Sequence, residues 1–281
     1  MKGQVISSSG LNYTVFANGE TYQATARGKL KLKKENILVG DYVEINNGAI
    51  DKVYERSSFF IRPSVANIDL IVAVLSSEPK PDLTITDKLC ASAIREGVEV
   101  VFAVNKTDLG DNLYKEILNE YKDTGFTIID VSAKTGRNLD KLKELLKGRI
   151  SAFAGQSAVG KSSLMNALFS LDIKTGELSQ KISRGKHTTT KSTVYYLGEY
   201  TIIDTPGFYT LEADIEPEEL FLYYPEYEGY LGKCKFRGCS HISEPDCAII
   251  DAVESGDLQR NRYERYKEIY NELKLRRKTY E

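Results

Sequence analysis

The sequence predicts a multidomain α/β protein in which a parallel-sheet domain lies between a small β-barrel and a metal-binding, helix-rich segment. Three observations support this fold class. Residues 1–65 contain short β-rich pieces, residues 66–213 alternate apolar strands with helical stretches, and residues 214–281 contain clustered cysteines followed by a charged helix. A chain of 281 residues is long enough for three such domains.

The first segment reads as a small barrel. Its β-rich pieces are 3–9, 12–18, 21–26 and 41–46, separated by turns that contain Gly and Asn. Five or so short strands in about sixty residues fit an OB-fold. Arg62-Pro63 then marks a linker.

The second segment begins with a continuous apolar run at 68–76, which is typical of a strand buried on both faces of a parallel sheet. Further strands are expected at 98–104, 126–132, 149–155, 192–198 and 200–207, and helices at 82–96, near 111–122, near 138–147 and from 161. Such alternation predicts a doubly wound domain. After about residue 213 we expect little periodicity until a charged helix near 257–279.

The net charge of −2 argues against a uniformly basic nucleic-acid binder. Residues 1–62 contain nine Lys and Arg against six Asp and Glu, and residues 256–281 contain eight against five. Any contact with a polyanion is therefore expected at the two ends, although each basic cluster could also be a solvated face. Without a membrane-length apolar stretch or a signal-peptide core, we expect a cytoplasmic protein that does not contact membranes. A monomer is our expectation, and the sequence leaves the oligomeric state open.

A phosphate-binding loop is predicted at "GQSAVGKS" (155–162), a full match to G-x-x-x-x-G-K-[ST] between a strand and a helix. Gly155 and Gly160 let backbone amides wrap a β-phosphate. Lys161 would place its charge between the β- and γ-phosphates, in binding and in catalysis, and Ser162 would bind Mg²⁺. The remaining phosphate-contacting positions are Gln156, Ser157, Ala158, Val159 and Ser163. The alternative is a structural Gly-rich turn.

A second nucleotide loop is predicted at "IIDTPG" (202–207), which ends the last apolar strand. Asp204 would hold Mg²⁺ through water, and the Gly207 amide would sense the γ-phosphate. The polar stretch "RGKHTTTKS" (184–192) lies between the two loops. Thr189 is our candidate for the second Mg²⁺ hydroxyl, with Thr188 and Thr190 left open.

The base-binding residues are predicted at "NKTD" (105–108) and at "SAK", which is Ser132, Ala133 and Lys134. Asp108 can accept two hydrogen bonds from guanine that adenine cannot offer, and such a bidentate pair contributes about 1–3 kcal/mol of discrimination. Asn105 and Lys106 would brace the loop, with the lysine stem over the base. GTP is therefore preferred to ATP, and the competing interpretation of a P-loop ATPase or kinase is disfavoured.

The order of these motifs is unusual, because the base loops precede the phosphate loop. In a parallel α/β sheet every ligand loop leaves the carboxyl end of a strand, so the pocket does not depend on the order in which the chain visits them. Joining the old termini and opening new ones elsewhere gives the same site. The sequence therefore predicts a circularly permuted GTPase.

A structural zinc site is predicted at Cys234, Cys239, His241 and Cys247, spaced C-x₄-C-x-H-x₅-C. Three thiolates and one imidazole complete a closed tetrahedral shell. We expect the metal to stabilise a Tyr-rich segment that has little core of its own; the alternative is a set of unliganded thiols. Lys233, Lys235 and Arg237 interleave with Phe236, either as a nucleic-acid contact or as solvated charges.

Taken in order, "NKTD", "SAK", "GQSAVGKS", "HTTT" and "DTPG", between a β-barrel and a Cys₃His knuckle, resemble the RsgA (also called YjeQ) family over essentially the whole chain. The resemblance implies a circularly permuted bacterial GTPase that acts in late maturation of the small (30S) ribosomal subunit. It also implies low intrinsic GTP hydrolysis that the subunit stimulates, with the barrel and the zinc segment contacting rRNA.

Catalysis needs a group that orients water, and Phe208 stands where Ras-like GTPases carry a glutamine. We expect slow hydrolysis until docking on RNA orders another group. His187 is the nearest candidate, and it could equally be a loop histidine without a catalytic part. The leading hypothesis is a switch whose hydrolysis drives release from a pre-ribosomal particle. The alternative is a GTP-binding RNA module in which hydrolysis is incidental.

Overall fold

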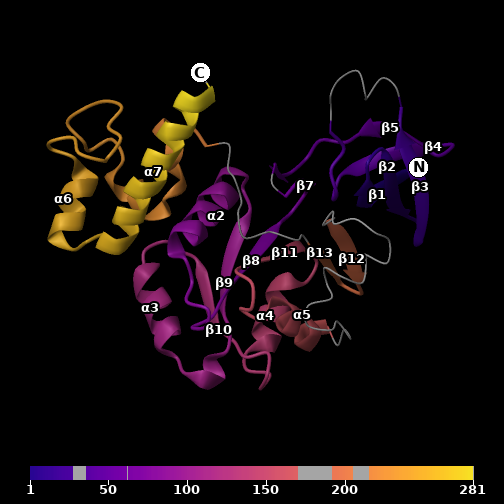
Figure 1. Cartoon of the computed structure of the whole chain (residues 1–281), viewed down its shortest axis with the longest axis horizontal. Coiled ribbons are helices and arrows are strands. Elements are labelled where there is room, and N and C mark those ends of the chain that lie inside the picture. Colours follow the sequence, from indigo (N-terminus) through magenta and orange to yellow (C-terminus); the bar gives the residue numbers. More distant parts are fainter. Residues whose placement is uncertain (28–35, 62, 170–191, 205–214, 281) are drawn as a thin grey trace.

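A computed structural model describes most of the chain. The described residues are 1–27, 36–61, 63–169, 192–204 and 215–280. A central sheet domain separates an N-terminal barrel from a C-terminal group of helices, which lie on opposite sides of it (Figure 1). Within these residues, no helix has both the length and the apolar character that a membrane span requires.

The N-terminal strands close into a barrel in the order β1-β2-β3-β5-β4. They are β1 (Lys2–Ser9), β2 (Asn12–Ala17), β3 (Glu20–Ala26), β4 (Tyr42–Asn46) and β5 (Ala49–Val53). Alternate side chains such as Val5, Val15 and Ile50 are fully buried inside. The predicted OB-fold is therefore confirmed. The strand β5 is not among the pieces predicted from the sequence, because Ile50 is its one fully buried residue and no alternation of apolar residues results.

The sheet domain follows the expected alternation. Its elements are β8 (Leu70–Leu75), α2 (Leu83–Arg95), β9 (Glu99–Val104), η1 (Thr107–Leu109), α3 (Asn112–Glu120), β10 (Thr127–Asp130), α4 (Leu139–Leu146), β11 (Ile150–Ala154), α5 (Lys161–Phe169), β12 (Thr193–Leu197) and β13 (Tyr200–Asp204). The strand order is β10-β9-β8-β11-β13-β12, and among these described strands β12 alone runs antiparallel to its neighbour.

Helices cover both faces of this sheet, so its central strands are buried on both sides. Ile71 of β8 packs in one core with Leu89 of α2, whereas its neighbour Val72 packs in another core with Leu164 of α5. All six residues of β8 are buried. The parallel strands therefore point their carboxyl ends, and the loops that follow them, to one edge of the sheet.

The barrel rests against the edge strand β12. The small pair β6 (Phe59–Phe60) and β7 (Val65–Ala66) joins it to the sheet domain along the chain. The Tyr196 hydroxyl of β12 donates to Gln4 Oε1 of β1. The Tyr196 ring centroid lies 4.4 Å from that of Phe16 of β2. Barrel and sheet are thus held by a polar and an aromatic contact.

The C-terminal part consists of η2 (Pro217–Tyr223), η3 (Pro225–Tyr230), α6 (Ala248–Ser255) and α7 (Arg260–Tyr280). Contrary to the expectation of little core, fifteen buried residues form one cluster that includes residues of this part and Ala91 of α2. Tyrosine rings supply much of it, and Tyr224 and Tyr227 stack with centroids 5.2 Å apart. Tyr227 lies in η3 and Tyr224 lies between η2 and η3, and such short 3₁₀ helices give no clear hydrophobic period in the sequence.

A buried ion cluster fixes this part to the sheet domain; it consists of Asp87, Glu120, Glu226, Arg262 and Arg265. Arg262 of α7 pairs with Asp87 of α2 and with Glu226 of η3. Arg265 Nε lies 2.6 Å from Asp87 Oδ2, and its Nη1 lies 3.0 Å from Glu120 Oε2 at the end of α3. Helix α7 therefore packs along α2, as Figure 1 shows.

Candidate nucleotide site and metal centre

The predicted phosphate loop runs from the end of β11 into the start of α5. Gly155 has φ +145°, and a Cβ there would lie 2.3 Å from the carbonyl oxygen of Val74. Gly160 has φ +96°, and a Cβ there would lie 2.5 Å from Asn105 Nδ2. Both positions therefore need glycine for conformation and for space. The loop wraps at the N-terminus of a helix, where anions bind.

Lys161 is held inside this loop. Its Nζ donates to the carbonyl oxygens of Gly155, at 2.5 Å, and of Gln156, at 2.7 Å. Burial lowers the pKa of Lys161, while the carboxylate of Asp204 at the end of β13 acts to raise it. Burial also raises the pKa of Asp204 to about 6, against the opposing effect of Lys161. The two side chains are thus both largely removed from water and close enough for their charges to interact.

Asn105 joins the base loop to the phosphate loop. Its side chain is buried, with 4% exposed. Its Nδ2 donates to the Val159 carbonyl oxygen at 3.0 Å, and its Oδ1 accepts from the Ala133 amide at 3.1 Å. One amide group therefore touches the loops after β10 and β11 from its own place after β9. Residues 105, 133 and 159 meet at one edge of the sheet.

Lys106 makes a second connection between these loops. Its backbone has φ +64°. Its Nζ donates to the carbonyl oxygens of Ala158, at 2.9 Å, and of Glu78, at 2.6 Å. Glu78, on the loop after β8, is a partner that the sequence motifs did not indicate, because it contributes a backbone atom.

Asp108 follows in the short helix η1, where its side chain is exposed. The Ser132 hydroxyl donates to Asp108 Oδ1 at 2.7 Å and so fixes the carboxylate relative to the "SAK" loop. Lys134 is exposed, and Ser162 and Ser163 are half-buried in the first turn of α5. Thr188, Thr189, Thr190, His187 and Gly207 lie outside the described residues.

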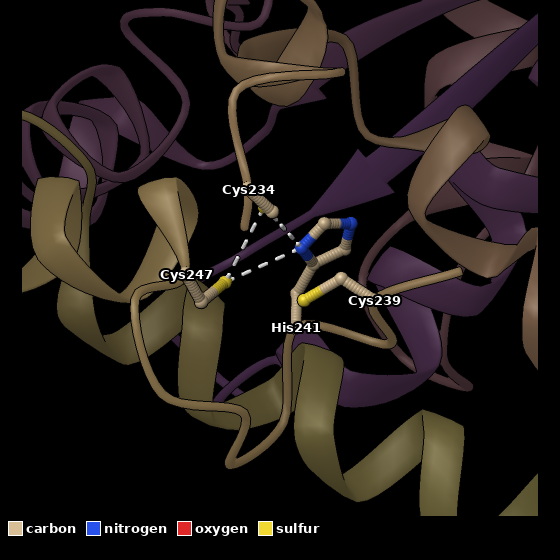
Figure 2. Close-up of side chains that lie close together, drawn as sticks. All are labelled: Cys234, Cys239, His241 and Cys247. Carbon is tan, nitrogen blue, oxygen red and sulfur yellow. Dashed lines mark hydrogen bonds between the residues drawn. The ribbon is translucent and has the colours of Figure 1, made fainter. Parts of the chain in front are cut away.

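The predicted zinc ligands are brought together in the C-terminal part. The candidate ligand atoms of Cys234, Cys239, His241 and Cys247 all lie within 4.8 Å of one another, and Figure 2 shows their side chains converging. The Cys234 and Cys247 sulfurs are 3.8 Å apart. His241 Nδ1 lies 3.6 Å from the first and 3.4 Å from the second. Tetrahedral zinc with Zn–S bonds of 2.3 Å requires sulfurs about 3.8 Å apart, so the group fits.

The protonation chemistry also suits a metal. Burial lowers the pKa of His241, which keeps the imidazole in the neutral form that ligates. Burial raises the pKa of the Cys239 thiol to about 12. A bound metal cation would lower this pKa again and stabilise the thiolate form. Metal binding would therefore release protons. A zinc ion held by these four side chains would have no open coordination position, which is typical of a structural site.

The fold and these loops define a circularly permuted GTPase, because the base loops come first in the chain and still meet the phosphate loop. Residues 53–214 match the RsgA GTPase family and residues 2–52 match the RsgA N-terminal domain. The chain belongs to the RsgA GTPase family.

Relatives and solved structures agree along nearly the full length. Proteins named small ribosomal subunit biogenesis GTPase RsgA from Clostridium botulinum (strain 657 / Type Ba4) and Geobacillus sp. (strain WCH70) are each 38% identical, with 99% of both chains covered. The crystal structure of YjeQ from Thermotoga maritima matches with TM-score 0.80 and 36% identity, covering 97% of this chain and 98% of that one. That of YloQ, described as a circularly permuted GTPase, gives 0.76 and 30%, covering 98% and 95%.

Proposed function

We propose that the protein binds GTP with Mg²⁺ at the loops after β9, β10, β11 and β13, and hydrolyses it in the biogenesis of the small ribosomal subunit. The observation that carries this proposal is the Asn105 amide, which bonds to Val159 and to Ala133 at once. These two bonds, together with the bond from Lys106 to Ala158, support a pocket that the base and phosphate loops share. The relatives named small ribosomal subunit biogenesis GTPase support the biological setting.

Each site residue then has a proposed part. Asp108 accepts from guanine, while Lys106 and the amide of Ala133 flank the base. Lys161 contacts the β- and γ-phosphates, and the backbone of residues 155–160 wraps them. The proposed Mg²⁺ ligands are Ser162, Thr189 and Asp204, the last through water. Gly207 senses the γ-phosphate, and His187 is the proposed water-orienting group; Thr189, Gly207 and His187 lie outside the described residues.

Two surfaces support contact with rRNA. On the barrel, Lys2 Nζ lies 4.8 Å from the Tyr54 ring centroid and 5.1 Å from that of Tyr42. Lys52 Nζ lies 4.7 Å from the Tyr54 ring centroid. Lysine side chains can contact RNA phosphates, and aromatic rings next to them can stack with bases. On the zinc knuckle, the ring of Phe236 is 47% exposed beside Lys235.

The proposal includes three domains with boundaries near residues 65 and 213, and a cytoplasmic monomer. The barrel and the zinc segment hold the subunit, and the GTPase domain lies between them. Hydrolysis would then trigger release, because residues 205–214 connect β13 to the C-terminal part in the sequence.

Turnover measured with and without small subunits tests this function. We expect GTP hydrolysis to be slow alone, to rise when subunits are added, and to rise less at higher salt, because phosphate contacts are screened. His187→Ala should lose much of the stimulation if this residue orients water. If added subunits left the rate of GTP hydrolysis unchanged, a GTP-binding RNA module would be favoured instead. Phe208 in place of a glutamine supports that alternative.

The pKa of Asp204 predicts a pH dependence of Mg²⁺-linked nucleotide binding. A metal ligand must be deprotonated, and burial raises the pKa of Asp204 to about 6 in the metal-free protein. We therefore expect affinity for Mg²⁺·GDP to be full well above pH 6, where Asp204 is ionised, and to be lost progressively as the pH falls through 6. Titrations from pH 5 to 8 measure this. Asp204→Asn is the control, because it removes the titrating group; an unchanged pH profile in that variant would contradict the assignment.

A further inference from the structure

The zinc ligands depend on a short loop that the sequence motif does not explain. Residues 240–243 carry His241 between Cys239 and Cys247, and His241 adopts a left-handed φ of +60°. Non-glycine residues adopt this conformation at a cost, so surrounding contacts must hold it. In this loop the backbone amides and carbonyls bond to side chains that are not metal ligands.

Glu244 satisfies the donors of the loop. Its Oε1 accepts from the Ser240 amide at 2.7 Å and from the Ser240 hydroxyl. Its Oε2 accepts from the Ile242 amide at 2.9 Å and from the Ser243 amide at 3.1 Å. One carboxylate therefore accepts from three backbone amides that lie on either side of His241. A charged acceptor makes such bonds stronger than a neutral one would.

Helix α7 satisfies the acceptors. The Tyr266 hydroxyl donates to the Ser240 carbonyl oxygen at 2.7 Å. The Tyr263 hydroxyl lies 3.0 Å from the His241 carbonyl oxygen and 3.2 Å from that of Ile242. Both tyrosines have buried rings. Packing of the rings therefore fixes the positions of the two hydroxyls, independently of their bonds to the loop.

The helix that carries these tyrosines is itself anchored. Arg262 and Arg265, next to Tyr263 and Tyr266 in the chain, pair with Asp87 of α2 in the buried ion cluster. The same turns of α7 thus bond to the sheet domain and to the zinc loop. Helix α7 therefore fixes the position of the zinc loop relative to the GTPase domain.

We propose that Glu244, Tyr263 and Tyr266 are positioning residues of the metal centre, which hold the loop so that His241 and Cys239 face Cys234 and Cys247. Zinc then binds a site that the protein fold has largely shaped, rather than one that the metal must create. Groups that hydrogen-bond to metal ligands commonly change metal affinity 10- to 100-fold when they are replaced. Tyr263 bonds to the His241 carbonyl oxygen, whereas Glu244 and Tyr266 act through the backbone next to His241.

Zinc affinity tests the proposal on the full zinc-loaded chain, with 4-(2-pyridylazo)resorcinol as the competing chelator. We expect Glu244→Gln to bind zinc about tenfold or more weakly, because the new NH₂ group replaces an acceptor oxygen with a donor that faces backbone amide donors. Tyr263→Phe and Tyr266→Phe should each weaken binding about fivefold, since each removes a hydroxyl from the loop.

Two matched variants separate positioning from charge and from packing. Asp246→Asn removes an equal charge from the same stretch, where Asp246 pairs with Lys235 at the surface. Tyr270→Phe removes a hydroxyl from the same helix, at a position for which no bond to residues 240–243 is found in the described part of the chain. Both should change the affinity less than twofold. Equal affinities for Glu244→Gln and Asp246→Asn would overturn the proposal.

Hydrogen exchange supplies a readout that does not need the metal. After chelation, we expect the Ile242 and Ser243 amides of the unmodified chain to stay protected, and Glu244→Gln to exchange them at least tenfold faster. Free exchange of these amides in the metal-free, unmodified chain would overturn the proposal, even if Glu244→Gln failed to fold.

Discussion

Arg262→Ala is expected to lower the free energy of unfolding by about 3–5 kcal/mol, because it leaves buried charges without a partner. The Arg262 side chain is 3% exposed and pairs with Asp87 and Glu226, which are 0% and 5% exposed. The guanidinium also lies 4.7 Å from the ring centroids of both Tyr121 and Tyr224. Its removal takes from Glu226 the arginine that it pairs with and leaves Asp87 and Glu120 to share the cation of Arg265.

Arg277→Ala is the matched control on the same helix. Arg277 pairs with Glu218 where both side chains are more than half exposed. Surface pairs of this kind contribute about 0–1 kcal/mol, so this variant should unfold nearly as the unmodified chain does. Urea unfolding followed by circular dichroism gives both values. A loss for Arg262→Ala no larger than that for Arg277→Ala would contradict the structural role of the buried ion cluster.

The same cluster predicts how the chain unfolds. Asp87 lies on α2 of the sheet domain, and both arginines lie on α7. If either part unfolded alone, the charges of the other part would lose their ion-pair partners. Release of a bound fluorescent GDP should therefore occur at the same urea concentration as the loss of helical signal. We therefore expect the C-terminal part to unfold together with the GTPase domain.

The sheet and the nucleotide loops could be predicted from the sequence because their signals are local. A strand buried on both faces, such as Leu70–Leu75, must be a continuous apolar run. The loops at its neighbours' ends carry short motifs with defined chemistry. Since parallel strands bring those ends together, the permuted order of "NKTD" and "GQSAVGKS" did not hide the pocket.

The C-terminal core and the buried ion cluster could not be predicted in the same way. Arg262 and Arg265 lie in a helix of many charges, and a charged helix normally indicates a solvated face. Their partner Asp87 lies 175 residues away from Arg262 in the chain, and nothing local marks it as buried. Glu244 is equally inconspicuous, because its partners are backbone amides that any sequence supplies.

Asn105→Ala is expected to weaken GTP binding about tenfold or more and to destabilise the fold by about 1–3 kcal/mol. The variant leaves the Val159 carbonyl and the Ala133 amide without their bonds at 3.0 and 3.1 Å, and an unsatisfied buried polar group costs about that much. It also opens space beside Gly160, which packs against the Asn105 amide. Equilibrium binding of fluorescent GTP, together with urea unfolding, measures both effects.

Asp108→Asn separates the joining of the loops from the recognition of the base. Asp108 is exposed and bonds to Ser132, so its replacement leaves the link between the base and phosphate loops intact. We expect this variant to keep its stability while its preference for GTP over ATP falls, because asparagine cannot accept both guanine hydrogen bonds. If Asn105→Ala matched Asp108→Asn in stability and kept its affinity for GTP, the two loops would not depend on one shared amide. A pocket assembled from separated parts of a permuted chain would then need another explanation.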